Sequence, residues 1–264
     1  MSRQTLKEQA MSKLLTFVGC GNMALAIAQG LKDNYEIEVV ARATPSMDKF
    51  EKSLGKTIQK HALKDFDITE KTIIFAVKPQ NLQEVSAQLH GQAEAFYSIL
   101  AGTKLESLKN AIKANHYVRA MPNMAAAVQR SMTTLTGDTA LKEEAVSIFS
   151  AIGKAHWLGS EKEIDVATAL AGSGPAYLAL VAEALADGAV NQGLKRADAM
   201  VVMRGLFEGF GSIIQEQHPA LLKDSVMSPG GTTAAGYAAL ESGNVRDAFI
   251  QAIAKANERA KALS

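Results

Sequence analysis

Short apolar runs and amphipathic helical stripes alternate along the first half of the chain. The runs end at glycine, proline or a polar residue, as strands buried on both faces do, and they cover residues 14–18, 37–40, 72–77, 96–101, 118–121 and 131–136. Apolar positions at helical spacing follow the first run over residues 22–32, and Pro45 opens a second helix toward Leu54. The alternation predicts right-handed βαβ units and a mainly parallel, doubly wound sheet over residues 13–158.

The pattern becomes purely helical from Glu161 onward. No segment alternates with period 2 between turn residues, and alanine is dense. Apolar stripes predict helices over residues 175–190, 201–217 and 245–263. Glycines at 205, 209 and 211 lie inside one of them, where each costs about 0.5–1 kcal/mol relative to alanine, so they indicate close approach of another helix. We therefore expect an α/β domain over 13–158 followed by an all-helical domain over 159–264.

The composition excludes several classes of protein. An apolar share of 47% in 264 residues excludes a disordered chain, and 28 basic against 27 acidic residues argue against a nucleic-acid partner. The single cysteine, Cys20, allows no internal disulfide and fits a reducing cytosol. The absence of any apolar run of about 18 residues predicts that no segment spans a membrane. The stretch Met1–Lys13 lacks the apolar region of a signal peptide and is interpreted as a solvated extension.

A glycine-rich turn joins the first predicted strand to the first helix. Its pattern is the Gly-x-Gly-x-x-Ala variant of the dinucleotide fingerprint, and its residues are Gly19, Cys20, Gly21, Asn22, Met23 and Ala24. The first glycine permits a tight turn, the second lets the backbone approach a pyrophosphate, and the alanine lets the helix pack on the strand. Backbone amides at Asn22 and Met23 would then face the phosphates. A plain strand–helix turn, with Cys20 as a small filler, is the alternative interpretation.

The end of the second strand favours NADPH over NADH. The fingerprint expects an acid there to hold a ribose 2′-hydroxyl, but residues 39–44 contain none. Arg42 offers a guanidinium and Thr44 a hydroxyl, which suit a 2′-phosphate. NADH is kept as the alternative cofactor, because the alternative interpretation of Arg42 is a solvated arginine at a strand end.

Three further strand ends supply candidates for the rest of the cofactor site. Open α/β sheets bind ligands at the carboxyl ends of their strands. The candidate residues there are Ala76, Val77, Lys78 and Pro79, then Ala101 and Gly102, then Asn123. Lys78 taken alone is more often a solvated lysine than a functional one.

A second constellation lies between two predicted helices of the second half. In Ser228-Pro-Gly-Gly-Thr-Thr233, we expect Gly230 and Gly231 to expose consecutive backbone amides and Thr232 and Thr233 to cap the next helix. Such a concavity suits a carboxylate, although an ordinary tight turn explains the residues equally well. We interpret Gly172-Ser-Gly-Pro175 as a helix start capped by Ser173. The histidines show no metal-ligand spacing and no Ser/His/Asp set is present, so the chemistry is expected to belong to a cofactor, without a metal site.

Five motifs in this order and spacing resemble the pyrroline-5-carboxylate reductase family. They occupy residues 17–24, 75–80, 119–123, 172–177 and 228–233, and the resemblance runs from about Leu14 to the C-terminus. It implies NAD(P)H-dependent reduction of the C=N bond of 1-pyrroline-5-carboxylate to L-proline in the cytoplasm, the last step of proline biosynthesis. It also implies an N-terminal Rossmann-type sheet and a helical C-terminal dimerisation domain. The resemblance further implies a homodimer, with a decamer of five dimers as a larger form, and an active site completed at the dimer interface.

The resemblance also implies roles for single residues. Residues 19–24 would hold the pyrophosphate, Lys78, Pro79, Ala101 and Gly102 would line the cofactor cleft, and Asn123 would lie near the nicotinamide. Ser228, Gly231, Thr232 and Thr233 would bind the substrate carboxylate, with the catalytic Thr233 hydroxyl near the imine nitrogen. Glu161 and Ser225 correspond to further binding positions, for substrate and cofactor respectively. The sequence departs from the family where Met124-Ala125 follow Asn123 and where no asparagine lies near Leu63.

Two other interpretations stay open. A β-hydroxyacid dehydrogenase also joins such a sheet to helices, but it would place a catalytic lysine early in the helical half, and residues 175–193 contain no lysine. A non-enzymatic dinucleotide-sensing dimer would have no need of the anion-binding turn at 228–233.

Overall fold

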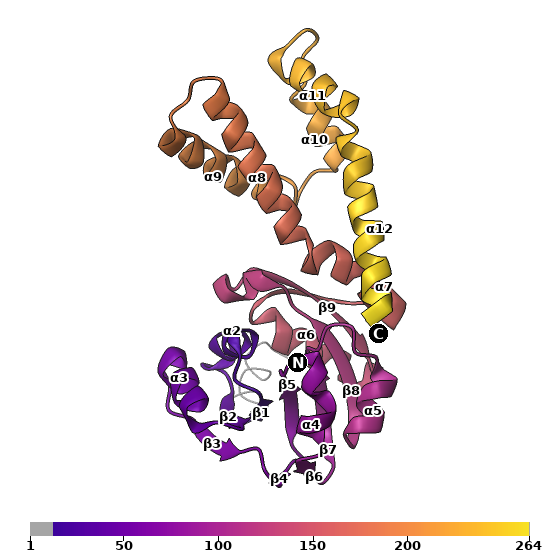
Figure 1. The fold of residues 1–264 in the computed structure, drawn as a ribbon. Helices are drawn as coiled ribbons and strands as arrows, with labels where there is room; N and C mark the ends of the chain where they lie inside the picture. The colour runs from indigo at the N-terminus through magenta and orange to yellow at the C-terminus, as the bar shows by residue number, and fades with distance from the viewer. Residues whose placement is uncertain (1–12, 264) are drawn as a thin grey trace, which may run out of the picture. The chain divides into compact units, whose positions relative to one another are not determined.

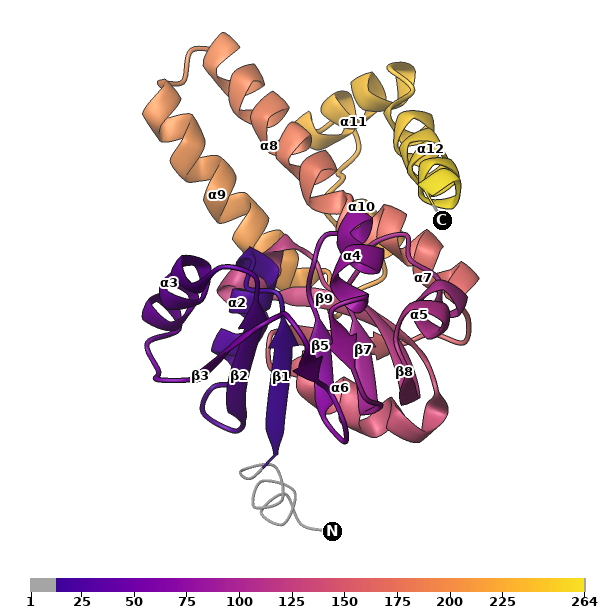
Figure 2. The ribbon, with the colours of Figure 1, turned by 60° about the horizontal axis from the view of Figure 1, so that its bottom comes forward.

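A computed structural model describes residues 13–263, which form two compact units (Figures 1 and 2). The first unit runs to Gly172 and takes in the chain from Asn257 onward, and the second comprises Ser173–Ala256. The units therefore divide after Gly172, whereas the sequence analysis placed the division after residue 158. Of the expected N-terminal extension only Lys13 is described. It is not simply solvated, because its ammonium pairs with Glu144 at 2.7 Å.

The first unit is built on an eight-stranded sheet in the order β10-β9-β8-β7-β5-β1-β2-β3. Figure 2 shows β3, β2, β1, β5, β7 and β8 side by side in this order. Strands β3, β2, β1, β5, β7 and β8 pair in parallel, which confirms the predicted doubly wound arrangement. A difference from that prediction is that β9 runs antiparallel to β8, and β10 follows the direction of β9. The strands are β1 (Leu14–Val18), β2 (Glu36–Ala41), β3 (Gln59–Ala62), β5 (Thr72–Phe75), β7 (Ala93–Ser98), β8 (Ala114–Met121), β9 (Ser131–Gly137) and β10 (Gly153–Trp157), with β4 (Phe66–Asp67) and β6 (Leu89–His90) forming a separate pair.

Helices cover both faces of this sheet. They are α2 (Asn22–Leu31), α3 (Thr44–Leu54), α4 (Leu82–Ser86), α5 (Leu105–Ala111), α6 (Lys142–Ser150) and α7 (Glu161–Ala167), followed by a π-helical turn at Thr168–Gly172. Successive strand residues point to opposite faces. Phe17 and Ile74 accordingly join a core cluster with α2, α3 and α6, while Val18 and Phe75 join a second cluster with α4 and α5. Burial on both faces explains why the strands are continuous apolar runs.

The second unit contains no strand among the residues that the structure describes, as predicted. Its helices are α8 (Gly174–Asn191), α9 (Arg196–Ile213), α10 (Pro219–Ser225), α11 (Thr232–Ser242) and α12 (Val245–Leu263), the last of which ends in the first unit. Helices α8 and α9 form a hairpin (Figure 1). Large apolar side chains on this hairpin remain exposed, among them Leu178, Leu180, Leu206 and Phe210. Too few side chains of the same chain pack on these residues to bury them in a hydrophobic core.

The helical stretch Glu161–Asn191 has the length and the mean hydropathy, 1.4, that a membrane span requires. The sequence analysis predicted no span. Length and composition alone are a weak indication, because helices of a soluble core or of a subunit interface have both.

Gly30 of α2 packs directly on the turn that follows α6. An added Cβ would stand 2.5 Å from the carbonyl oxygen of Ala151 and 2.8 Å from Cγ2 of Ile152. Gly30→Ala should therefore lower the free energy of unfolding by about 1–3 kcal/mol through overpacking. Helix propensity alone would instead raise it by about 0.5–1 kcal/mol, so the sign of the change in urea unfolding decides between the two effects.

Candidate active site

Strand β1 ends in a backbone turn that glycine alone tolerates. Gly19 has φ +104°, and an added Cβ would lie 2.7 Å from the carbonyl oxygen of Ala76 at the end of β5. Its N–H donates to the carbonyl of Val40 on β2 at 2.9 Å. The turn therefore draws the ends of β1, β2 and β5 together, as expected of the first glycine of the fingerprint.

The turn leads into the N-terminus of α2, which is left open. Gly21 is the N-cap residue, no side chain caps the helix, and its first turn contains no acid. An added Cβ at Gly21 would meet nothing within 4 Å, so the glycine keeps space free in front of the helix. Ala24 is fully buried. The first amides of a helix lack partners within it, so the N–H groups of Asn22 and Met23 are free at the start of α2, an arrangement that suits an anion.

A cavity of about 370 Å³ lies at these strand ends. Its lining comes from the ends of β1, β2 and β5 and the segments that follow them: Val18, Gly19, Cys20, Gly21, Val40, Ala41, Arg42, Ala43, Ser46, Leu63, Ala76, Val77, Lys78, Asn81 and Val85. The structure thus brings together the expected Gly19–Gly21, Arg42 and Ala76–Lys78. Thr44, Pro79, Ala101 and Gly102 do not line it. Ser46, Asn81 and Val85 were missed, although Ser46 lies in the same first helical turn as Thr44.

Two polar side chains of the lining have defined surroundings. Burial raises the pKa of the Cys20 thiol, which favours the neutral form and fits a small filler. The Arg42 guanidinium donates from Nη1 to Glu84 Oε1 at 2.6 Å. Arg42 is therefore not simply solvated, and its partner is a carboxylate that no sequence motif indicated.

Asn123 follows β8 and uses its side-chain amide within the protein. Its Oδ1 accepts from the backbone N–H of Ala125 at 3.1 Å, and its Nδ2 donates to the carbonyl of Ala171 at 3.0 Å. The amide fastens the π-helical turn to the end of β8. Its expected place near a nicotinamide stays a prediction.

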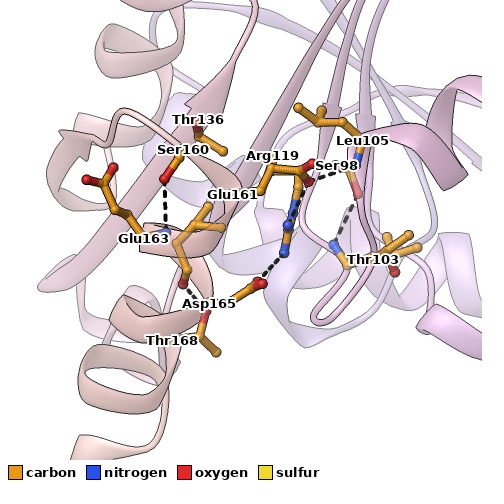
Figure 3. Close-up of polar contacts among 12 residues, drawn as sticks. Ser98, Thr103, Leu105, Arg119, Thr136, Ser160, Glu161, Glu163, Asp165 and Thr168 are labelled. Atoms are coloured by element: carbon orange, nitrogen blue, oxygen red, sulfur yellow. Dashed lines mark hydrogen bonds and ion pairs between the residues drawn. The ribbon is translucent and has the colours of Figure 1, made fainter. Parts of the chain in front are cut away.

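Arg119, on β8, forms a buried cluster of ion pairs with two carboxylates of α7 (Figure 3). The side chain is 6% exposed, and its two terminal nitrogens donate to Glu161 Oε1 at 2.7 Å and Asp165 Oδ1 at 3.0 Å. The same oxygen of Glu161 accepts from the backbone N–H of Leu105, the first residue of α5, at 2.8 Å. The cluster thus ties β8, α5 and α7 together and explains why the compact unit continues past residue 158.

Sequence reasoning assigned Glu161 to the substrate and missed the cluster. One carboxylate oxygen of Glu161 is fully engaged by Arg119 and Leu105, so its substrate role remains a prediction. The available signal was the spacing of Glu161 and Asp165, which places two acids on one face of a helix. Nothing local to Arg119 indicated that this face would meet it.

The loop between α10 and α11 differs in detail from its expected form. Gly230 takes φ +69°, but the N–H of Gly231 donates to the carbonyl of Ser228 at 3.0 Å, so the expectation that both glycine amides are free is wrong. Gly231, not a threonine, is the N-cap residue, because Thr232 and Thr233 already lie in the helix. The free donors are therefore the first-turn amides of Thr232, Thr233 and Ala234. An added Cβ on Gly231 would collide with Ser228 Oγ.

Two serine hydroxyls of the second unit have defined surroundings, and only that of Ser173 departs from its expected role. Ser225 donates to the carbonyl of Leu222 at 2.8 Å in the last turn of α10, so its proton is used inside the helix. Ser173 stands at the N-cap position of α8, yet its side chain makes no capping hydrogen bond. Over residues 13–263, no three side chains of histidine, cysteine, aspartate or glutamate are grouped to hold a metal ion.

A doubly wound sheet with an open glycine turn, joined to a helical unit, defines a two-part dinucleotide-binding oxidoreductase. The comparisons narrow this class. Residues 161–263 match the family model for pyrroline-5-carboxylate reductase dimerisation, and residues 14–102 match that described as NADP oxidoreductase, coenzyme F420-dependent. The pyrroline-5-carboxylate reductase of Synechocystis is 37% identical over 266 residues, spanning 96% of this chain and 99% of that protein.

Solved structures agree. A pyrroline-5-carboxylate reductase from Coxiella burnetii is 32% identical with a TM-score of 0.82, covering 95% of this chain and 98% of that one. The Plasmodium falciparum pyrroline carboxylate reductase, solved with NADP bound, is 26% identical with a TM-score of 0.74 and covers 95% and 99%. The chain belongs to the pyrroline-5-carboxylate reductase family. A β-hydroxyacid dehydrogenase or a dinucleotide sensor is not favoured.

Arg119→Leu should lower the free energy of unfolding by about 2–4 kcal/mol, because it leaves the buried Asp165 and the partly exposed Glu161 without their cation. Arg119→Lys is the matched control and should cost less, since it keeps the charge and loses only the two-pronged geometry. Urea unfolding of both variants measures the difference. A loss below about 1 kcal/mol for the leucine variant would mean that water reaches both carboxylates.

Proposed function

We propose that the chain reduces the C=N bond of 1-pyrroline-5-carboxylate to L-proline with NADPH, and with NADH as a second donor, in the last step of proline biosynthesis. The observation that carries this proposal is family membership across both units, supported by the cavity at the glycine turn. A cytoplasmic location fits the free Cys20.

The cavity suits a dinucleotide for reasons of shape and charge. The open N-terminus of α2 suits a pyrophosphate, so residues 19–24 would hold it. Arg42 and Thr44 would receive the 2′-phosphate, and Ala76–Pro79 would flank the ribose side. Ala101, Gly102, Asn123 and Ser225 complete the proposed cofactor set. When bound, the nicotinamide supplies the hydride.

The turn before α11 is the proposed substrate site. The first-turn amides and the dipole of this helix attract a carboxylate, so Ser228, Gly230, Gly231 and Thr232 would hold that group. A protonated imine is already electrophilic, and the chief task of the protein is to position it. The Thr233 hydroxyl would then orient or donate a proton to the imine nitrogen. Glu161 is kept as a further substrate contact through its second carboxylate oxygen.

The helical unit, residues 159–264 by the sequence division, serves dimerisation. Among its described glycines, Gly205, Gly209 and Gly211 have open space where a Cβ would stand, so packing within the chain does not account for them. Large apolar side chains are exposed on the same helices. A second copy that covers these helices accounts for both observations. The homo-oligomer is proposed to be a dimer, with a decamer of five dimers as its larger form.

Thr233→Val removes one hydroxyl and keeps the shape of the side chain. It should lower kcat about 100-fold, the low end of a proton-transfer contribution, while the Kd for NADPH stays constant.

Gly231→Val should instead raise KM for the imine, because its side chain collides with Ser228 and crowds the carboxylate site. Steady-state kinetics with separate NADPH titrations measure both effects. Unchanged kcat/KM for the imine in both variants would place the substrate elsewhere.

Assembly is tested on the exposed face of α9. Leu206 and Phe210 are 55% and 49% exposed and lie one helical turn apart. Leu206→Lys combined with Phe210→Lys should convert the oligomer to monomers in sedimentation velocity at micromolar concentration. Helix content in circular dichroism should persist at low temperature. Glu208→Lys, on the same helix, serves as the charge control. A wild-type protein that is monomeric and fully active would contradict the proposal.

A further inference from the structure

One ion pair spans the rim of the cofactor cavity. Arg42, at the end of β2, donates from Nη1 to Glu84 Oε1 at 2.6 Å. Glu84 belongs to α4, on a segment whose residues Asn81 and Val85 line the same cavity. The pair therefore joins two walls that the chain builds from separate βαβ units.

The pair places a negative charge beside a cavity whose own lining carries only positive charge. The charged lining residues are Arg42 and Lys78, and no acid is among them. Glu84 lies outside the lining, yet its carboxylate contacts the guanidinium that a 2′-phosphate would need. The Glu84 carboxylate and a bound 2′-phosphate would then compete for the N–H donors of the Arg42 guanidinium, and their negative charges would repel each other.

We propose that Glu84 is a specificity-determining residue, which competes with the 2′-phosphate of NADPH for Arg42 and so narrows the preference for NADPH over NADH. The inference rests on the dinucleotide site of the proposed function. Both side chains are more than half exposed, at 54% and 55%, so their pair contributes little to stability and opens readily. Cofactors without a 2′-phosphate do not need the guanidinium and are indifferent to Glu84.

If Glu84 orients Arg42 and does not compete for it, its removal should change the affinity for a 2′-phosphate in the opposite direction. If Glu84 held Arg42 in the orientation that a phosphate requires, then its removal would weaken binding of a 2′-phosphate. Glu84→Gln keeps the size of the side chain, retains a hydrogen-bond acceptor and removes only the charge. The direction of the change in affinity therefore separates competition from orientation.

The experiment uses the full-length protein and two nucleotide probes that differ by the 2′-phosphate. Isothermal titration calorimetry measures the Kd of adenosine 2′,5′-bisphosphate and of 5′-AMP. Glu84→Gln should bind the bisphosphate about three- to tenfold more tightly, and the gain should shrink as salt is raised. Its affinity for 5′-AMP should stay within about twofold of the wild type. Glu143→Gln, an exposed first-turn glutamate of α6, is the matched control and should leave both constants unchanged.

Arg42→Gln completes a double-mutant cycle with Glu84→Gln. It should weaken the bisphosphate about 10- to 100-fold, and adding Glu84→Gln to it should give a smaller gain than in the wild-type background. The proposal is overturned if Glu84→Gln weakens the bisphosphate or leaves it unchanged. It is also overturned if 5′-AMP gains equally, or if Arg42→Gln leaves the affinity for the bisphosphate unchanged. These titrations contain no imine, so a failure of the proposed reduction would appear separately, as absent imine-dependent NADPH oxidation.

Discussion

Gly19 leaves β1 so close to the carbonyl of Ala76 that no side chain fits between them, and its left-handed turn is tied to β2 by the hydrogen bond to Val40. This close approach sets the spacing of three strand ends at once. It also aims the chain into α2, whose uncapped N-terminus then faces the cavity. A larger residue would have to separate β1 from β5, and the separation would widen the cavity and turn the N-terminus of α2 away from it.

Much of the fold could be predicted because its signals are local. Strands buried on both faces are apolar runs, and the helices between them show a regular stripe, so β1, α2 and β2 were each recognisable from residues 14–41 alone. The direction of β9 was not recognisable. The apolar run at 131–136 would have the same burial pattern in a parallel or an antiparallel strand. Only its pairing with Val118–Met121 of β8 shows that it is antiparallel. The extension of the compact first unit to Gly172 was not recognisable for the same reason, since it depends on Arg119 reaching α7.

In the candidate site, the backbone features could be predicted from the sequence, but the partners of the side chains could not. The positions defined by backbone geometry, Gly19 and Gly21, follow from a motif that encodes its own turn. Side-chain partners were not predictable, because Arg42 finds Glu84 across 42 residues and Asn123 finds Ala171 across 48. A recognisable turn motif also leaves open which of its amides stay free. The N–H of Gly231 donates to the carbonyl of Ser228, and this hydrogen bond depends on backbone angles that the residue types do not specify.

The exposed apolar faces of α8 and α9 give this protein a stability that depends on its own concentration. A helical unit that buries its surface against a second copy gains free energy by mass action, so dilution favours dissociation and then unfolding. Assembly also becomes a second-order step in folding, slower at low expression and in competition with aggregation through the same uncovered side chains. The helical unit of a newly made chain therefore stays open to proteolysis until the chain meets its partner.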